Sequence, residues 1–268
     1  MAPRRRLDAE LVRRGLARSR THAGELLTAG RVLLAGQPAT KAATQVDPAV
    51  AIVVRALSDD PDYASRGGHK LAGALDAFAA DGLAIAGRHC LDAGASTGGF
   101  TDVLLRRGAA HVVAVDVGYG QLAWALRQDE RVSVLDRTNV RELTPDLLPY
   151  RPDLVVGDLS FISLRLVLAP LVAISAAGAD LVLMVKPQFE VGRERLGHGG
   201  VVRDPVLRAG AVREVAAAAA AEGLGSRGVC ASPLPGPSGN VEYFLWLSAG
   251  APALAEADLH RAVDEGPQ

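Results

Sequence analysis

At 268 residues the chain has room for one small and one medium-sized domain. Its 49% hydrophobic and 22% charged residues are ordinary globular usage, which excludes a disordered or fibrous protein. The net charge of −1 is unevenly distributed: residues 1–56 hold ten basic and four acidic side chains, and the rest of the chain is acidic. With only Cys90 and Cys230, far apart, neither a disulfide framework nor a metal site is expected.

The basic end is typical of a module that binds a polyanion, because phosphate contacts supply most sequence-independent affinity for nucleic acid. The alternative is that these arginines form an ordinary solvated helix face. Acidic residues follow the first arginines where a signal peptide would be apolar, and the longest apolar run, residues 215–221, is far below the roughly 20 residues that span a bilayer. We expect a cytoplasmic monomer with no membrane segment.

The N-terminal stretch predicts two helices followed by short strands. Apolar residues at helical spacing indicate a first helix that ends at Gly15 and a second that Ser19 caps and Gly30 ends. Strands are predicted at residues 32–34 and 52–54 around a turn. Two helices and then strands form a small α+β domain.

An acidic, proline-containing stretch at residues 58–65 predicts a linker between a small domain at 1–57 and a larger one at 66–268. In the larger domain, short apolar runs alternate with helical segments, which is typical of an α/β fold with a mostly parallel sheet. Strands are predicted at residues 90–93, 112–117, 132–136, 154–158, 181–186, 228–231 and 241–247. Trp124 and Trp246 lie in apolar patterns and are expected in the core.

A glycine-rich turn at residues 91–101 joins the first of these strands to a helix, where a ligand could approach the backbone and the helix N-terminus. The dinucleotide fingerprint needs glycine where Ser96 stands, so a nicotinamide enzyme is disfavoured. Asp116 ends the next strand and is placed to bind a ribose diol. A nucleoside cofactor without a pyrophosphate fits; the alternative is a glycine turn that only closes the α/β unit.

Five segments in chain order carry a resemblance to a known family: residues 92–100, 115–122, 157–163, 185–190 and 236–243. Together they resemble the TlyA family, also called hemolysin A-like, which joins an RNA-binding domain of the ribosomal-protein-S-four type to an FtsJ-like ribose methyltransferase. The front of the chain resembles that RNA-binding fold at residues 6–8, 15–20 and 30–32. The implied catalytic fold is a Rossmann-like class I methyltransferase with a seven-stranded sheet.

The resemblance implies a catalytic tetrad of Lys70, Asp158, Lys186 and Glu242 around the attacking 2'-hydroxyl. Only one other lysine, Lys41, is present among 29 basic residues, so lysine is concentrated where a proton must be handled. Lys186 is the candidate for orienting and deprotonating the hydroxyl, while the two carboxylates hold the lysines in place. An ordinary cluster of ion pairs at strand ends is the alternative.

The resemblance also implies S-adenosyl-L-methionine as the cofactor. The residues expected on its methionine side are Asp92, Gly94, Ser96, Thr97, Gly98, Gly99 and Phe100. Asp116 is expected at its ribose and Asn139 at its adenine. The residues expected to contact RNA are Arg4, Arg6, Arg14, Arg18, Arg20 and Arg31.

The activity that the resemblance implies is transfer of a methyl group to a cytidine 2'-hydroxyl in 16S or 23S ribosomal RNA, or in both, with ribosomal RNA or subunits as the partner. Three alternatives are a methyltransferase acting on another RNA, a pore-forming hemolysin, and a non-catalytic RNA-binding assembly factor. The absence of a long apolar segment speaks against the hemolysin, and an intact tetrad speaks against the assembly factor.

Overall fold

The computed structural model describes residues 4–17, 19–55, 61–236 and 238–267, and the chain divides into two units, residues 1–61 and 62–268. In the first unit the elements are β1 (Arg5–Arg6), α1 (Leu7–Arg13), α2 (Arg20–Thr28), β2 (Val32–Leu34), β3 (Gln37–Pro38), β4 (Gln45–Val46) and β5 (Ile52–Val54). Both helices and the strands contribute to one apolar core, in which Leu7, Leu11 and Val32 are fully buried.

The local signals that predicted the two N-terminal helices are confirmed. The Ser19 side chain accepts a hydrogen bond from the backbone N–H of His22 at 3.1 Å, which caps α2. Gly15 and Gly30 follow the two helices with φ of 70° and 66°, the left-handed conformation in which the chain leaves a helix. The strands predicted at residues 32–34 and 52–54 are also present.

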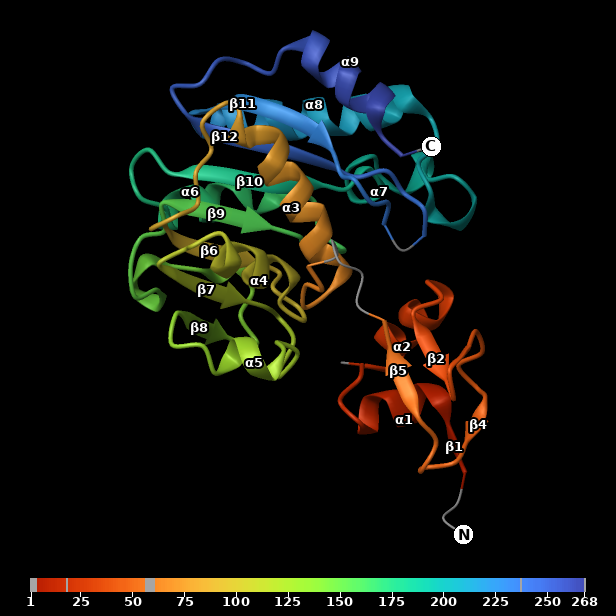
Figure 1. The fold of residues 1–268 in the computed structure, drawn as a ribbon. Coiled ribbons are helices and arrows are strands. Elements are labelled where there is room, and N and C mark those ends of the chain that lie inside the picture. Colours follow the sequence, from red (N-terminus) through yellow and green to blue (C-terminus); the bar gives the residue numbers. More distant parts are fainter. Residues whose placement is uncertain (1–3, 18, 56–60, 237, 268) are drawn as a thin grey trace. The chain divides into compact units, whose positions relative to one another are not determined.

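The second unit is a sheet of seven strands covered by helices on both faces (Figure 1). Its elements are α3 (Arg66–Ala79), β6 (His89–Ala93), α4 (Gly99–Arg106), β7 (His111–Val115), α5 (Trp124–Arg127), β8 (Val132–Leu135), β9 (Leu154–Gly157), α6 (Leu168–Ile174), β10 (Asp180–Val185), α7 (Pro187–Glu190), α8 (Pro205–Ala221), β11 (Leu224–Ala231), β12 (Tyr243–Ala249) and α9 (Glu256–Glu265), with short 3-10 turns between them. The strand order is β11-β12-β10-β9-β6-β7-β8.

Strands β10, β9, β6, β7 and β8 run parallel, and β12 is antiparallel to both of its neighbours. All seven predicted strands exist, with shifted ends. β7 stops at Val115 rather than at 117, because Asp116 already turns into the following loop. β11 begins at Leu224, four residues earlier than predicted, and β12 begins at Tyr243.

The core of this unit consists of two apolar layers, one on each face of the sheet. Alternate residues of one strand join different layers: Cys90 belongs to the layer that includes α3 and α4, whereas Leu91 belongs to the layer that includes α6, α8 and α9. This alternation is the consequence of a parallel sheet that is buried on both sides. Residues 56–60, which include part of the predicted linker, lie outside the described residues.

We expect Leu11→Ala to lower the unfolding free energy of the N-terminal unit by about 2–5 kcal/mol, because Leu11 is fully buried in a core that the other unit does not share. Both tryptophans, Trp124 and Trp246, belong to residues 62–268, so their fluorescence reports only that unit. Thermal unfolding followed by circular dichroism should shift, while the fluorescence transition should stay in place.

Leu104→Ala, which removes a buried side chain from the other core, is the matched control and should move the fluorescence transition. A fluorescence transition that moves with Leu11→Ala would mean that the two units unfold together.

Candidate active site and basic surface

Lys186, which is buried, and Asp158, which is partly exposed, form the first of two lysine–carboxylate pairs. Lys186 directly follows β10 and Asp158 directly follows β9, which lies beside it. Lys186 Nζ lies 2.6 Å from Asp158 Oδ1 and donates a hydrogen bond to Ser160 Oγ at 2.7 Å. Lys186 is only 8% exposed, so its charge needs these partners.

Lys70 and Glu242 form the second pair. Lys70 projects from the first turns of α3, and Glu242 directly precedes β12. The Nζ to Oε2 distance is 2.5 Å, and both side chains are buried. Gly236 lies against this carboxylate, because a Cβ at Gly236 would stand 2.7 Å from Glu242 Oε1. An ion pair this well enclosed holds both groups in one geometry.

The sheet register brings the two pairs to the same edge. Val185 at the end of β10 is paired with Tyr243 at the start of β12, in antiparallel orientation. Lys186 and Glu242 are therefore each one residue beyond that pair, on neighbouring strands. The structure thus gathers all four residues of the predicted tetrad at the carboxyl ends of the parallel strands, where ligands of open α/β sheets bind.

The glycine-rich turn lies next to Asp158. Gly94 has φ of 85°, and a Cβ there would stand 2.8 Å from the Asp158 carbonyl oxygen. Gly98 has φ of 96°, and its Cβ would stand 2.3 Å from Leu126 Cδ1. Both positions therefore require glycine, and the turn delivers the chain to the N-terminus of α4 at Gly99.

Asp92 is a buried carboxylate with an incomplete set of partners. It is fully buried at the end of β6; Oδ2 accepts a hydrogen bond from Thr101 Oγ1 at 2.7 Å, and Oδ1 has none. The pKa of Asp92 is raised to about 7, mainly by burial, with smaller contributions from the nearby charges of Asp158 and Asp116. A buried acceptor without a partner fits a ligand that brings a donor or a positive charge.

Asp116 fixes the turn from the other side. Its two carboxylate oxygens accept backbone N–H groups of Ser96 at 2.8 Å and of Gly118 at 2.7 Å. Each oxygen keeps a second lone pair that a ribose hydroxyl could use. Asn139 follows β8, and its Oδ1 accepts the N–H of Arg141 at 3.1 Å, which leaves the amide nitrogen for a base.

The remaining predicted cofactor residues divide between the surface and the core. Ser96 and Thr97 are exposed, whereas Gly98, Gly99 and Phe100 are buried. The Phe100 ring packs on Phe244 with centroids 5.9 Å apart, so this side chain supports the core. A tight turn, a helix N-terminus and acidic groups at two neighbouring strand ends together fit S-adenosyl-L-methionine, which carries a ribose, an ammonium and a sulfonium.

Sequence reasoning placed Trp124 in the core, and this is wrong: its side chain is 74% exposed. α5 is a single turn that buries Leu126 against the glycine turn, so Trp124, two residues earlier, faces outward. Trp246 is 3% exposed, as predicted. Sequence reasoning also missed Ser160 and Thr101, whose only signal was a hydroxyl two or nine residues after a predicted acid.

In the N-terminal unit, two of the predicted RNA-binding arginines are anchored by a buried acid. Asp8 is 4% exposed and accepts hydrogen bonds from Arg6 at 3.0 Å and from Arg20 at 2.8 Å. These guanidinium groups hold the pKa of Asp8 well below its usual range. The arginine side chains stay 44% and 61% exposed, so they can still meet a phosphate.

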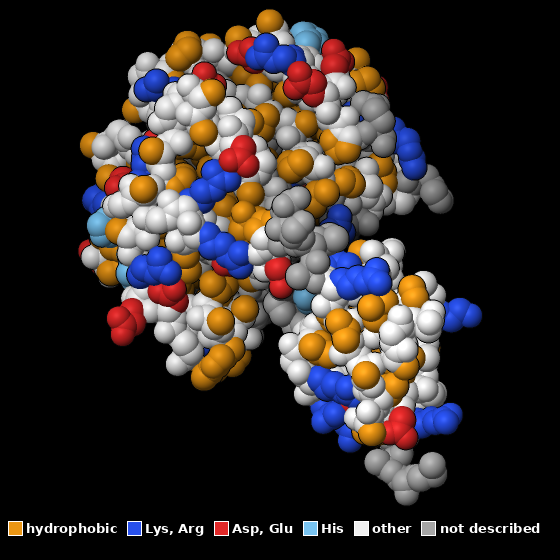
Figure 2. Space-filling model, viewed as in Figure 1, with side chains coloured by type: hydrophobic (Ala, Val, Ile, Leu, Met, Phe, Trp, Pro, Cys, Tyr) orange, Lys and Arg blue, Asp and Glu red, His pale blue; other side chains and the backbone are white. Residues whose placement is uncertain are grey.

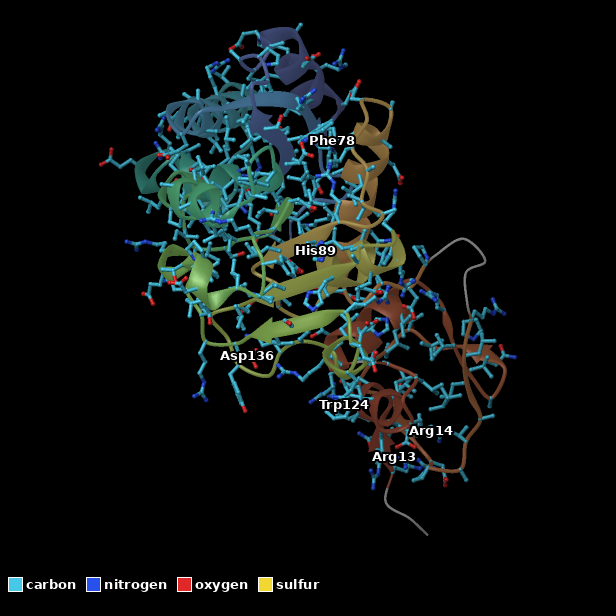
Figure 3. The ribbon with its side chains drawn as sticks, turned by 90° about the vertical axis from the view of Figure 1, so that its left-hand side faces the viewer. Arg13, Arg14, Phe78, His89, Trp124 and Asp136 are labelled. Atoms are coloured by element: carbon cyan, nitrogen blue, oxygen red, sulfur yellow. The ribbon has the colours of Figure 1, made fainter. Side chains whose placement is uncertain are left out.

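Arg14 has a different setting. It donates to the buried Glu10 at 2.8 Å and to the carbonyl oxygens of Val50 and Pro48, both at 2.7 Å, which ties α1 to the end of the unit. Arg13, its neighbour on α1, also pairs with Glu10 (Figure 3), and together they lower the pKa of that carboxyl to about 2. Arg14 therefore supports the fold.

Of the other predicted RNA contacts, Arg4 is exposed ahead of β1, and Arg31 Nε donates to the Arg55 carbonyl at 3.0 Å. Arg18 lies outside the described residues. In Figure 2 most charged side chains visible on this unit are basic.

Comparisons with known proteins agree with both units. Residues 63–249 match the family described as FtsJ-like methyltransferase, and residues 5–52 match the S4 domain. The chain is 60% identical over 273 residues to the 16S/23S rRNA (cytidine-2'-O)-methyltransferase TlyA of Mycobacterium tuberculosis, with 100% of both chains covered. It is 35% identical to hemolysin A of Brachyspira hyodysenteriae, in a match that covers 89% of this chain and 98% of hemolysin A.

A solved structure from Streptococcus thermophilus that carries the name hemolysin superimposes with a TM-score of 0.77 at 36% identity and covers 99% of this chain and 96% of that one. Within the described part of the chain, no helix is both long and apolar enough to cross a membrane.

We expect Asp92→Asn to stabilise the cofactor-free protein by on the order of 3 kcal/mol at about pH 8, and by less at about pH 5.5. The folded protein holds the Asp92 proton up to a pKa of about 7, whereas the unfolded chain releases it near ~3.9. Stability of the wild type therefore falls as the pH rises between these values, and asparagine removes that loss. Urea unfolding at both pH values measures it.

Asp76→Asn, at an exposed acid of α3, is the control and should give the same small change at both pH values. An equal effect of Asp92→Asn at the two pH values would contradict the prediction.

Proposed function

The chain belongs to the TlyA family of FtsJ-like methyltransferases, and we propose that it transfers a methyl group from S-adenosyl-L-methionine to a cytidine 2'-hydroxyl of 16S or 23S ribosomal RNA, or of both. The observation that carries this proposal is the gathering of two buried lysines, each paired with a carboxylate, beside a glycine turn at one edge of the sheet. Arginine could form a purely structural ion pair as well as lysine, yet Lys70 and Lys186 are two of only three lysines among the 29 basic residues of the chain.

When bound, S-adenosyl-L-methionine supplies a methyl group on a positively charged sulfur. In the transfer the ribose oxygen would bond to that methyl carbon as the carbon–sulfur bond breaks and S-adenosylhomocysteine leaves, and Lys186, acting as the neutral amine, would accept the hydroxyl proton. Asp158 stabilises the ammonium that results, at 2.6 Å. Lys70, held by Glu242, supplies a second positive group at the same edge, suited to orient the ribose oxygen.

The turn at residues 94–99 and the N-terminus of α4 would hold the methionine part of the cofactor, with the partnerless Oδ1 of Asp92 toward its positive charge. Asp116 would bind the ribose and Asn139 the adenine. The residues fit these roles because each carries an acceptor or a donor at the carboxyl end of a neighbouring parallel strand.

The S4 domain would deliver the enzyme to ribosomal RNA through phosphate contacts of its exposed arginines, Arg4, Arg6 and Arg20. Buried Asp8 presents two of them in fixed directions, which reduces the side-chain entropy lost on binding. A ribosomal substrate places the reaction in the cytoplasm, and we propose a monomer as the working form.

We expect Lys186→Ala and Lys186→Arg to lose at least about 100-fold in single-turnover methyl transfer, because alanine removes the amine and arginine is too basic to accept a proton at neutral pH. Cofactor and RNA binding should change by only a few-fold. The measurement is transfer of labelled methyl to purified ribosomal subunits at saturating RNA and cofactor, with the product nucleotide mapped by its 2'-O-methyl mark.

Lys41→Ala, at an exposed lysine of the other unit, is the matched control and should keep the rate at saturating RNA. Wild-type protein that labels no ribosomal RNA would refute the proposed function, and leakage of lipid vesicles in a parallel assay would support a hemolysin. A near-normal rate in Lys186→Ala would refute the tetrad alone.

We expect neutralising Arg6, Arg18 and Arg20 together to flatten the salt dependence of rRNA binding by about 2–3 units of log–log slope, because each phosphate contact releases counterions. Binding titrations over a range of salt concentrations measure this slope. Neutralising Arg213, Arg227 and Arg261 in the catalytic unit is the control for the loss of three charges. An unchanged slope in the Arg6, Arg18 and Arg20 variant would mean that RNA uses another surface.

A further inference from the structure

Lys186 Nζ has two polar partners on the loop that follows β9. It lies 2.6 Å from Asp158 Oδ1 and donates a hydrogen bond to Ser160 Oγ at 2.7 Å. The hydrogen bond to Ser160 fixes one direction at the tetrahedral nitrogen, and the attraction of Asp158 restricts rotation about that direction, so together they limit where the remaining position points. With Asp158 alone, the ammonium at the end of a four-carbon stem could rotate about its single contact.

We propose that Ser160 is a positioning residue for methyl transfer, whose hydroxyl turns the remaining position of Lys186 Nζ toward the ribose 2'-hydroxyl. This inference rests on the proposed function and adds a residue to its site. Ser160 is an exposed residue that contacts the buried amine, so a substrate at the surface of the site could reach both groups.

The loop that carries Ser160 is itself held in place. Glu190 is 3% exposed, and its two carboxylate oxygens accept hydrogen bonds from Ser163 Oγ at 2.5 Å and from the backbone N–H of Leu164 at 2.8 Å. Arg165 Nε lies 3.4 Å from the same carboxylate. The buried Glu190 carboxylate, which has partners on both oxygens, therefore holds residues 163 and 164 in place.

Lys186 and Glu190 come from one short segment, since α7 spans Pro187–Glu190 and begins directly after Lys186. This segment holds the loop at both ends: Lys186 binds its start, at Asp158 and Ser160, and Glu190 binds its end. The contacts of Glu190 with residues 163 and 164 are independent of the Lys186–Ser160 hydrogen bond, and they limit where the loop that carries Ser160 can lie.

Ser160→Ala should lower kcat by about 10- to 100-fold, because a small misorientation of a catalytic group costs that much in rate. KM for S-adenosyl-L-methionine and for the ribosomal subunit should stay within about twofold, since the hydroxyl acts through Lys186 rather than on either ligand. Ser160→Thr keeps the hydroxyl and should restore kcat to within a few-fold. Ser133→Ala, which removes a hydroxyl on the outer strand β8, is the control and should leave both constants unchanged.

Steady-state methyl transfer to ribosomal subunits by the full-length protein decides between the outcomes. An active wild type with unchanged kcat in Ser160→Ala would overturn the inference and leave the proposed function standing. The same holds if Ser160→Thr is as slow as Ser160→Ala, or if Ser160→Ala raises KM and keeps kcat. A wild type that labels no ribosomal RNA would overturn the proposed function and this inference with it.

Discussion

Burial of lysine ammonium groups at the carboxyl edge of the sheet is the constraint on which the catalytic unit depends. A buried ammonium is stable only when a carboxylate and further hydrogen-bond partners surround it. Lys70 and Lys186 each have one carboxylate within 2.6 Å. The partner of Lys70 is Glu242, which precedes β12 and is far from α3 in sequence, and the partner of Lys186 is Asp158, which follows β9, the neighbour of β10. The pairs therefore link elements far apart in the chain, and their geometry is as precise as the sheet register.

The antiparallel strand β12 is what makes this arrangement possible. In a wholly parallel sheet, Glu242 at the start of its strand would lie at the opposite edge from Lys186 at the end of β10. Reversing β12 brings its beginning to the carboxyl edge, one residue beyond the Val185–Tyr243 pair. The same edge carries Asp92, Asp116 and Asp158, each at or just past the end of a parallel strand. The antiparallel orientation of β12 thus brings Glu242 to the edge of the sheet that also carries Lys186 and the three aspartates.

Sequence patterns predicted the elements well because strands buried on both faces are short apolar runs that loops interrupt, and because Ser19, Gly15 and Gly30 act locally. What could not be predicted depends on contacts distant in sequence or on the phase of a very short element. Trp124 and Leu126 differ by about 200° around a helix, and four residues do not reveal which one faces the sheet. Likewise, the carbonyl partners of Arg14 lie more than thirty residues away.

The two units use buried acids for opposite purposes. Asp8 and Glu10 are saturated by arginines, so their negative charge is stabilised and the outer arginines are held ready for an anion. Asp92 lacks such a cation: one hydroxyl serves one oxygen, the other oxygen has no partner, and burial raises its pKa toward neutrality. The missing charge at Asp92 is what a positively charged ligand would provide. The acids of the N-terminal unit are therefore fully paired beneath a surface that we propose binds RNA phosphates, whereas Asp92 is incompletely paired where we propose that the cofactor binds.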